Sequence, residues 1–223
     1  MDYKLSFNVN ETIFLRNPEH TELGKKIVKQ SIDLIYTLGF EAFTFKKLAK
    51  EVGTTEASIY RYFENKHRLL LYVINWYWLF MDYLIDVQIQ NINENKLKLK
   101  TIIQIFANEL PESTNGLEYN KRYLNQIVIS ESSKVYLIKD VAEINKNEVF
   151  KPYKDLCAKI ADVMAMYNKK YGYPKSLSST LIETAHQQQF FSQHLPRLTD
   201  VTEKNRKKFT SQFLEDLIFK ALG

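Results

Sequence analysis

Residues 43–67 read FTFKKLAKEVGTTEASIYRYFENKH, and this stretch decides the fold that we predict for the chain. Gly53 interrupts its helical pattern at a point where a left-handed turn suits a residue that has no Cβ. Thr44 and Thr55 stand where two short helices would begin, and their hydroxyls can cap free backbone amides. The stretch therefore predicts a helix-turn-helix followed by the start of a longer helix.

Each of the two short helices has an apolar stripe that can pack against a neighbour. Leu48 and Val52 supply it in the first helix, and Ile59 and Phe63 supply it in the second. Ala49 is the small residue expected where two helix backbones approach closely. The pattern indicates a compact helical head.

The outward side of the second helix carries hydroxyls, a guanidinium and small groups near its amino-terminal end. These outward residues are Glu56, Ala57, Ser58, Tyr60, Arg61 and Tyr62. Such a set suits the major groove of DNA, where arginine can bind guanine and small residues allow close approach. Nearby hydroxyls and lysines can hold phosphates. The alternative is an ordinary helical hairpin whose polar residues face water.

In this respect the stretch resembles the DNA-binding head of the tetracycline-repressor (TetR) family of bacterial transcriptional regulators. The matching residues follow the family pattern in order and spacing: Thr44, Leu48, Ala49, Gly53, Thr54, Thr55, Ile59, Tyr60, Tyr62, Phe63 and Lys66. The specific resemblance covers residues 22–72, and the rest resembles the family only in length and helical character. Thr54 departs from a usually apolar position, and His67 from a usually acidic one.

The resemblance implies roles for individual residues in this head. Phosphate contacts would come from Thr44, Ser58, Tyr60, Tyr62 and Lys66. Base contacts would come from Thr55, Glu56, Ala57 and Arg61. It also implies a homodimer on double-stranded DNA with a palindromic operator, and a repressor that is released by a small, mostly apolar ligand.

Composition agrees with an all-α fold of 223 residues. Only 6 glycines and 5 prolines occur, which favours long helices, and 45% hydrophobic residues allow a sizeable core. The net charge of +5 and the isoelectric point near 9.0 fit a polyanionic partner without proving one. Residues 24–68 hold nine Lys or Arg and five Asp or Glu, so the basic surplus includes the head.

The single cysteine, Cys157, excludes an internal disulfide and a multi-cysteine metal site. The sequence shows neither an apolar segment long enough to span a membrane nor an amino-terminal signal pattern. We therefore expect a cytoplasmic protein without a membrane partner.

We predict three parts: an arm over residues 1–20, a helix-turn-helix domain over 21–67, and a helical effector-binding and dimerisation domain over 68–223. The arm could reach a minor groove with Arg16 or pack through its apolar residues, and its apolar content favours packing. Helices are expected from Thr21 to Leu38 before Gly39, from Asn65 along a long connector, and over 93–110, 117–131, 133–170 with a break near Pro152, 176–194 and 201–222.

Aromatic and amide side chains in the larger part suggest a ligand pocket. The candidates are Trp76, Trp78, Phe80 and Tyr83 on the connector, and His186, Gln187, Gln189, Phe190 and Phe191 on the penultimate helix. The last helix has an apolar stripe that resembles one member of the family's four-helix dimer interface, formed by Phe213, Leu214, Leu217, Ile218 and Ala221. The alternative for both sets is intramolecular core.

A different class, a metal-dependent enzyme on a helical bundle, rests on two Glu-x-x-His patterns. These are Glu64 to His67 and Glu183 to His186. The signal is weak because such short patterns occur often by chance and because the first belongs to the helix-turn-helix stretch. We expect no catalytic residues, metal or cofactor. A DNA-binding regulator without an effector is a further alternative.

Overall fold

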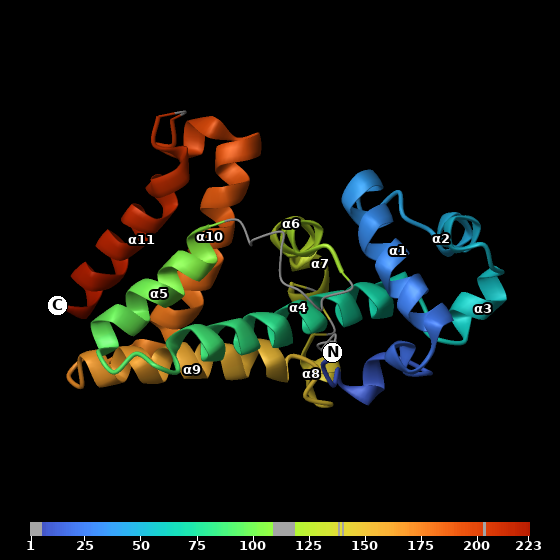
Figure 1. The fold of residues 1–223 in the computed structure, drawn as a ribbon, viewed down its shortest axis with the longest axis horizontal. Coiled ribbons are helices and arrows are strands. Elements are labelled where there is room, and N and C mark those ends of the chain that lie inside the picture. Colours follow the sequence, from blue (N-terminus) through green and yellow to red (C-terminus); the bar gives the residue numbers. More distant parts are fainter. Residues whose placement is uncertain (1–5, 109–118, 138, 140, 203) are drawn as a thin grey trace. The chain divides into compact units, whose positions relative to one another are not determined.

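The computed structural model describes residues 6–108, 119–137, 139, 141–202 and 204–223, and over these the chain is built from helices without a β-strand. Figure 1 labels the α-helices. Their bounds are α1 Glu22–Leu38, α2 Phe45–Val52, α3 Glu56–Tyr60, α4 Lys66–Ile89, α5 Asn95–Ala107, α6 Lys121–Glu131, α7 Ser133–Tyr136, α8 Val141–Asn145, α9 Lys151–Tyr167, α10 Pro174–His194 and α11 Arg206–Leu222. Three short 3-10 helices are η1 Glu11–Ile13, η2 Pro18–His20 and η3 Pro196–Leu198. The predicted all-α class is confirmed.

The chain divides into two compact units. The first unit comprises Met1–Phe80 and Pro111–Pro152, and the second comprises Met81–Leu110 and Tyr153–Gly223. The first part of α4 and helices α6 to α8 belong to the same unit as the head.

Threonine side chains and glycines determine where the helices of the head begin and end. The Thr21 hydroxyl accepts a hydrogen bond from the Gly24 amide at the start of α1, and Gly39 follows α1 with φ 76°. The Thr44 hydroxyl caps α2 through the Lys47 amide. Gly53 ends α2 with φ 75° and ψ 41°, the left-handed conformation that glycine adopts without steric cost. These predicted helix ends are confirmed.

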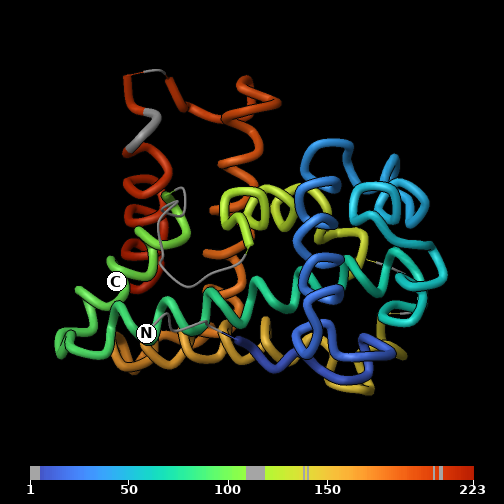
Figure 2. Tube along the Cα trace, turned by 45° about the vertical axis from the view of Figure 1, so that its right-hand side comes forward, coloured from blue at the N-terminus to red at the C-terminus, as the bar shows by residue number. Residues whose placement is uncertain are grey.

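The core of the first unit is formed by side chains from the head and from the first half of α4. Leu48, Val52, Ile59 and Phe63 are all buried, as their spacing predicts. Figure 2 shows α1, α2 and α3 gathered around the amino-terminal turns of α4. Positions 69–78 of α4 are buried without interruption, so this helix is enclosed on several sides.

The amino-terminal residues 6–20 pack on the first unit. Val9 and Ile13 are buried, and the Leu15 amide donates to the Tyr62 carbonyl over 2.8 Å. Gly24 allows a close approach, because a Cβ there would lie 2.3 Å from the Pro18 carbonyl oxygen. The packed alternative for the arm therefore holds for these residues.

The second unit is built from α5, α9, α10, α11 and the end of α4, and α5, α10 and α11 contact one another. Its core includes Leu99, Ile103, Leu181, Leu214 and Ile218. The starts of α9 and α11 differ from expectation. Pro152 lies in the first turn of α9, where proline fits, so the break comes before it. Helix α11 begins at Arg206, later than the predicted 201.

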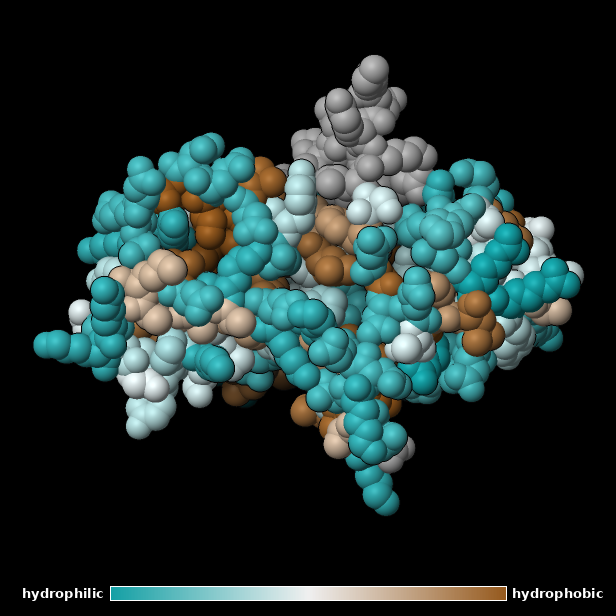
Figure 3. Space-filling model, turned by 90° about the horizontal axis from the view of Figure 1, so that it is seen from below, coloured by the Kyte–Doolittle hydropathy of each residue, from teal (hydrophilic) through white to brown (hydrophobic). Residues whose placement is uncertain are grey.

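On the face shown in Figure 3, hydrophilic residues predominate and the hydrophobic areas lie between them. Within the part of the chain that the structure describes, every helix falls short of the length or the apolar character needed to cross a bilayer.

Candidate nucleic-acid interface

Helix α3 turns a polar face outward and an apolar residue inward. Thr55, Glu56, Ala57 and Arg61 are exposed, whereas Ile59 is fully buried. The four residues expected to contact bases therefore lie together at the surface along α3 and its two ends. Ala57 adds little bulk between the longer side chains, which permits close approach of another backbone.

The amino-terminal end of α3 is held in a fixed conformation. The Thr55 hydroxyl accepts a hydrogen bond from the Ser58 amide at 3.2 Å, and the two hydroxyls lie 3.0 Å apart. This cap orients the first turn of α3 and leaves Thr55 at the surface. Ser58 is half-buried.

Tyr60 lies at the end of α3 with 49% of its surface exposed. Its ring packs edge-on against Phe45 of α2, with 5.0 Å between ring centroids. This contact fixes the phenol on the outer side of the head and leaves the residue partly in solvent. Its position is consistent with a phosphate contact.

The prediction that Tyr62 faces outward is wrong. Tyr62 is 2% exposed, and its hydroxyl lies 2.7 Å from the Thr21 hydroxyl at the start of α1. The reason is that α3 ends at Tyr60, so the helical face cannot be extended to residue 62. The Arg16 guanidinium covers the Tyr62 ring at 5.4 Å from its centroid.

Lys66 stands at the start of α4 and is half-buried. Its ammonium donates to the carbonyls of Phe40, Glu41 and Phe43 at 3.1, 3.3 and 3.4 Å. The same group lies 4.6 Å from the centroid of the Phe40 ring. Lys66 therefore holds the loop that leads into α2, and this loop positions the Thr44 cap.

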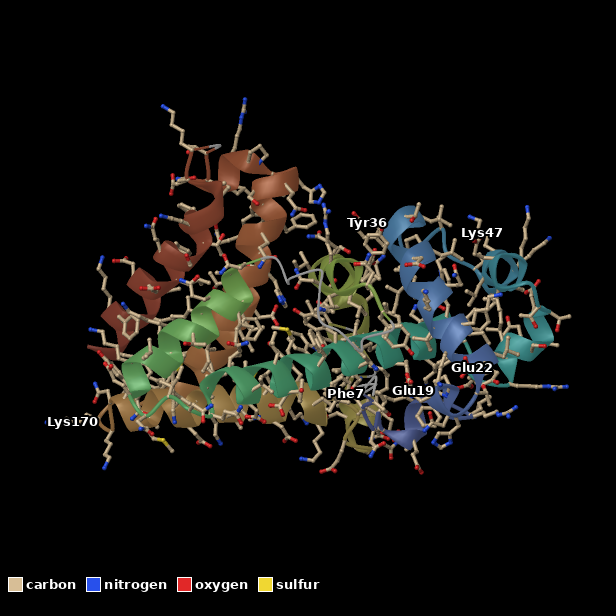
Figure 4. The ribbon with its side chains drawn as sticks, in the orientation of Figure 1. Phe7, Glu19, Glu22, Tyr36, Lys47 and Lys170 are labelled. Carbon is tan, nitrogen blue, oxygen red and sulfur yellow. The ribbon has the colours of Figure 1, made fainter. Side chains whose placement is uncertain are left out.

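Helix α2 adds three lysines that the sequence reasoning did not single out. Lys46, Lys47 and Lys50 are exposed, and their spacing in FKKLAKEV places them on the outer side of α2. Lys47, labelled in Figure 4, donates to the Ala42 carbonyl at 2.7 Å. The signal that could have identified them is the presence of lysine on both sides of the buried pair Leu48 and Ala49.

The predicted ligand-pocket residues fall into different units. In the first unit, Trp76 and Trp78 are about 2% and 1% exposed. Trp76 packs against Phe7, Phe80 and Tyr119, and the Trp78 indole donates a hydrogen bond to the Tyr136 hydroxyl. These tryptophans are thus core residues within their own unit.

The remaining pocket candidates lie in the second unit. His186 is buried, and its ring contacts that of Phe106 with 6.4 Å between centroids. Burial lowers the pKa of His186 to about 4, which keeps the ring neutral near pH 7. Gln189 donates to the Phe106 carbonyl at 2.6 Å. Tyr83 and Gln187 are exposed, and Phe190 and Phe191 are half-buried.

The apolar stripe of α11 separates into two rows. Leu214 and Ile218 are fully buried in the second unit, so these two predicted interface residues belong to the intramolecular core. Phe213 and Leu217 are half-buried and Ala221 is exposed. Together with Phe209, whose ring stacks on Phe213 at 6.0 Å between centroids, they form the outer row, which follows a four-residue spacing.

The metal alternative gains no support from the described residues, among which no group of three or more His, Cys, Asp or Glu could hold an ion. The two Glu-x-x-His patterns lie in different units. Glu183 accepts a hydrogen bond from the Tyr153 hydroxyl at 2.6 Å, whereas His186 is buried.

The family model for bacterial regulatory proteins of the tetR family matches residues 27–73, which cover α1 from its second turn onward, α2, α3 and the first turns of α4. No curated protein matches the chain in sequence.

Solved structures share the fold over nearly the whole chain. A tetR-family transcriptional regulator from Rhodococcus sp. has a TM-score of 0.63 and 12% identity, over 89% of this chain and 97% of its own. The regulator FadR from Bacillus subtilis, solved with stearoyl-CoA, has a TM-score of 0.60 and 15% identity over the same shares. The protein AibR, solved with isovaleryl coenzyme A and operator DNA, has a TM-score of 0.58 and 13% identity, again over 89% and 97%.

Proposed function

We propose that this chain, whose amino-terminal helices form the DNA-binding domain of the tetR family of bacterial regulatory proteins, is a repressor that binds a palindromic operator as a homodimer and is released by a small ligand. The observation that carries the proposal is the placement of α3. Its exposed face bears Thr55, Glu56, Ala57 and Arg61, and its inner residue Ile59 fixes it to the head.

The charges around α3 support contacts with a nucleic-acid backbone. Exposed lysines on α2 can neutralise phosphates and set the register of the head on the duplex. Thr44, Ser58 and Tyr60 add hydroxyls that can donate to phosphate oxygens. Tyr62 and Lys66 act differently in this proposal, because Tyr62 holds α1 and Lys66 holds the loop before α2.

A dimer would place two recognition helices about one turn of DNA apart, roughly 34 Å. The outer row of α11 supports self-association, since Phe209, Phe213 and Leu217 are only half-buried within one chain. Apolar surface of this kind is typical of helix faces that pair with another protein surface. The symmetry of such a dimer would be matched by an inverted repeat in the operator.

Release by a ligand requires that the ligand bind one body conformation better than another. Within the second unit, the predicted candidates for such a pocket are Tyr83, His186, Gln187, Gln189, Phe190 and Phe191. Two proteins of the same fold were solved with acyl-CoA molecules, which supports a ligand with a substantial apolar part. A regulator of this kind acts in the cytoplasm, where it reaches DNA.

The test is selection of binding sites from random DNA with the purified full chain at a stated salt concentration, followed by sequencing. We expect enrichment of an inverted repeat and binding that weakens steeply as salt rises. Arg61→Ala is the matched variant, because it should broaden the selected sequence without unfolding the head. A folded protein that enriches no sequence would refute the proposal.

A further inference from the structure

The first unit contains a cavity of about 320 Å³ that lies apart from the aromatic residues predicted to bind ligand. Leu71 of α4, Val135 of α7 and Ile144 of α8 form its apolar lining. His67, Arg68 and Lys134 complete the wall with longer polar side chains. A cavity of this volume is within the range of small-molecule sites.

The charged side chains of this wall differ in how far they are already neutralised. The Lys134 ammonium lies 2.7 Å from Glu41 and 2.8 Å from Glu131, so two carboxylates already balance it. Arg68 has a much weaker partner, because its Nε lies 3.8 Å from Glu64, whose side chain is 66% exposed. A guanidinium has five N–H donors, and this long contact, the one ion pair of Arg68 among the described residues, leaves capacity for another anion.

The position of Arg68 strengthens this preference. It lies in the first turn of α4, a helix of 24 residues, where the helix dipole favours negative charge. The Asn65 side-chain oxygen accepts a hydrogen bond from the Arg68 amide at 3.0 Å, and this bond fixes the turn. The apolar lining and the cationic edge together suit a molecule with one apolar end and one anionic end.

We infer that this cavity binds a small amphiphilic anion, an apolar chain that ends in a single carboxylate or phosphate, with the anion on Arg68 and the chain against Leu71, Val135 and Ile144. Only the regulatory consequence of this binding site rests on the proposed function. Binding itself is a property of the free protein and can be measured without DNA.

The regulatory consequence follows from Lys134, which lines the cavity and also holds the head. Its ammonium pairs with Glu41 in the loop before α2. The Glu131 carboxylate accepts a hydrogen bond from the Phe40 amide of the same loop at 3.3 Å. Burial alone would lower the pKa of Lys134, but its hydrogen bonds to Glu131 and Glu41 raise it, so the ion pairs persist at neutral pH. An occupant that displaces Lys134 would loosen this loop and lower DNA affinity.

Calorimetric titration of the full chain with octanoate, octyl phosphate and 1-octanol tests the ligand class. We expect at least one of the two anions to bind about tenfold or more tightly than 1-octanol, because only an anion can use Arg68. Whichever anion binds tighter identifies the headgroup. Shortening octanoate to hexanoate should weaken binding about threefold to fourfold for each methylene removed. Equal binding of anions and alcohol, or no binding of either anion, would overturn the inference.

Two variants and a matched control locate the site. Arg68→Met keeps the aliphatic stem and should remove the preference for anions, and Ile144→Trp should fill the cavity and weaken every probe about tenfold or more. Arg122→Met removes an exposed arginine on α6 of the same unit and should leave binding unchanged. Thermal unfolding verifies that each variant is folded. Wild-type binding in folded Arg68→Met and Ile144→Trp proteins would refute this location.

The effect on DNA is measured on a sequence taken from the selection experiment. Saturating anion should lower DNA affinity about fivefold or more, a typical coupling between two sites. Glu41→Gln should keep anion binding and lose this effect. Unchanged DNA affinity would refute coupling through Lys134, whereas a failed DNA selection would count against the proposed function and leave the calorimetric result intact.

Discussion

The helix pair α2–α3 in the head and the pair α10–α11 in the second unit differ in how their ends and outer faces are built. Helices α2 and α3 have 8 and 5 residues, and a threonine side chain caps each one. Helices α10 and α11 have 21 and 17 residues, and neither has a side-chain cap. The outer face of the head pair is polar and basic, whereas α11 keeps half-buried aromatic residues on its outer row.

This difference shows which partner each pair is suited to meet. A short, capped helix with a charged outer face can be presented rigidly to a polyanion. A long helix with apolar residues on both rows is stabilised by packing and can accept a second helical surface.

The largest effect is expected in α11, where the two rows should respond differently. Leu214→Ala removes a fully buried side chain and should lower the free energy of unfolding by about 2–5 kcal/mol. Phe213→Ser should change the unfolding of the single chain much less and should instead dissociate the dimer. Denaturant unfolding at fixed protein concentration and analytical ultracentrifugation separate the two, with exposed Gln212→Ala as control. A Phe213→Ser protein that remains dimeric would remove the outer row from the interface.

In the head, base contacts should be separable from phosphate contacts. Arg61→Ala should weaken the free energy of binding to the preferred DNA sequence by about 1–3 kcal/mol and should relax the base preference at one position of the operator. Lys46→Ala should weaken all sequences alike and reduce the salt slope by about 1. Exposed Lys170→Ala in the second unit is the charge-matched control. Fluorescence anisotropy at several salt concentrations measures both effects. Equal losses of DNA affinity from Lys46→Ala and Lys170→Ala would show that α2 does not contact the DNA phosphate backbone.

The free energy of unfolding of the second unit should depend on pH because His186 is buried. Its pKa falls from 6.5 to about 4 on folding because the ring is buried, so the unfolded chain binds more protons between these values. Stability is therefore fully present above pH 6.5 and declines as the pH falls toward 4, with a loss of roughly 2 kcal/mol at pH 5. His186→Leu should flatten this decline, and exposed His194→Leu should retain it in thermal unfolding from pH 7 to pH 5. An unchanged slope in His186→Leu would assign the acid sensitivity to other groups.

The smallest effect concerns the caps. Thr44→Ala should destabilise the head by about 1 kcal/mol because the Lys47 amide loses its partner. Tyr173→Ala, at the start of α10, should cost no capping energy since Tyr173 makes no side-chain cap. Hydrogen exchange of the α2 and α10 amides compares the two directly. Equal protection changes would mean that the α2 cap adds nothing to the stability of the head.

The head could be predicted from sequence in unusual detail because its signals are local. Thr21, Thr44, Thr55, Gly39 and Gly53 determine helix ends through bonds that span a few residues, and each was recognisable from residue type and spacing. The burial of Leu48, Val52, Ile59 and Phe63 followed from the same helical period. The base-contact candidates were implied by the family resemblance, and the structure places them at the surface.

The tertiary structure decided what depends on partners distant in the chain. Tyr62 follows the end of α3, and the orientation of its side chain is set by the hydrogen bond with Thr21, which lies 41 residues away in the chain. The ion pair of Lys134 with Glu41 joins groups 93 residues apart. The division of α11 into a buried row and an outer row depends on its packing against α5 and α10. Sequence spacing determines which residues share a helix face, but only the packing of other helices determines whether that face is buried.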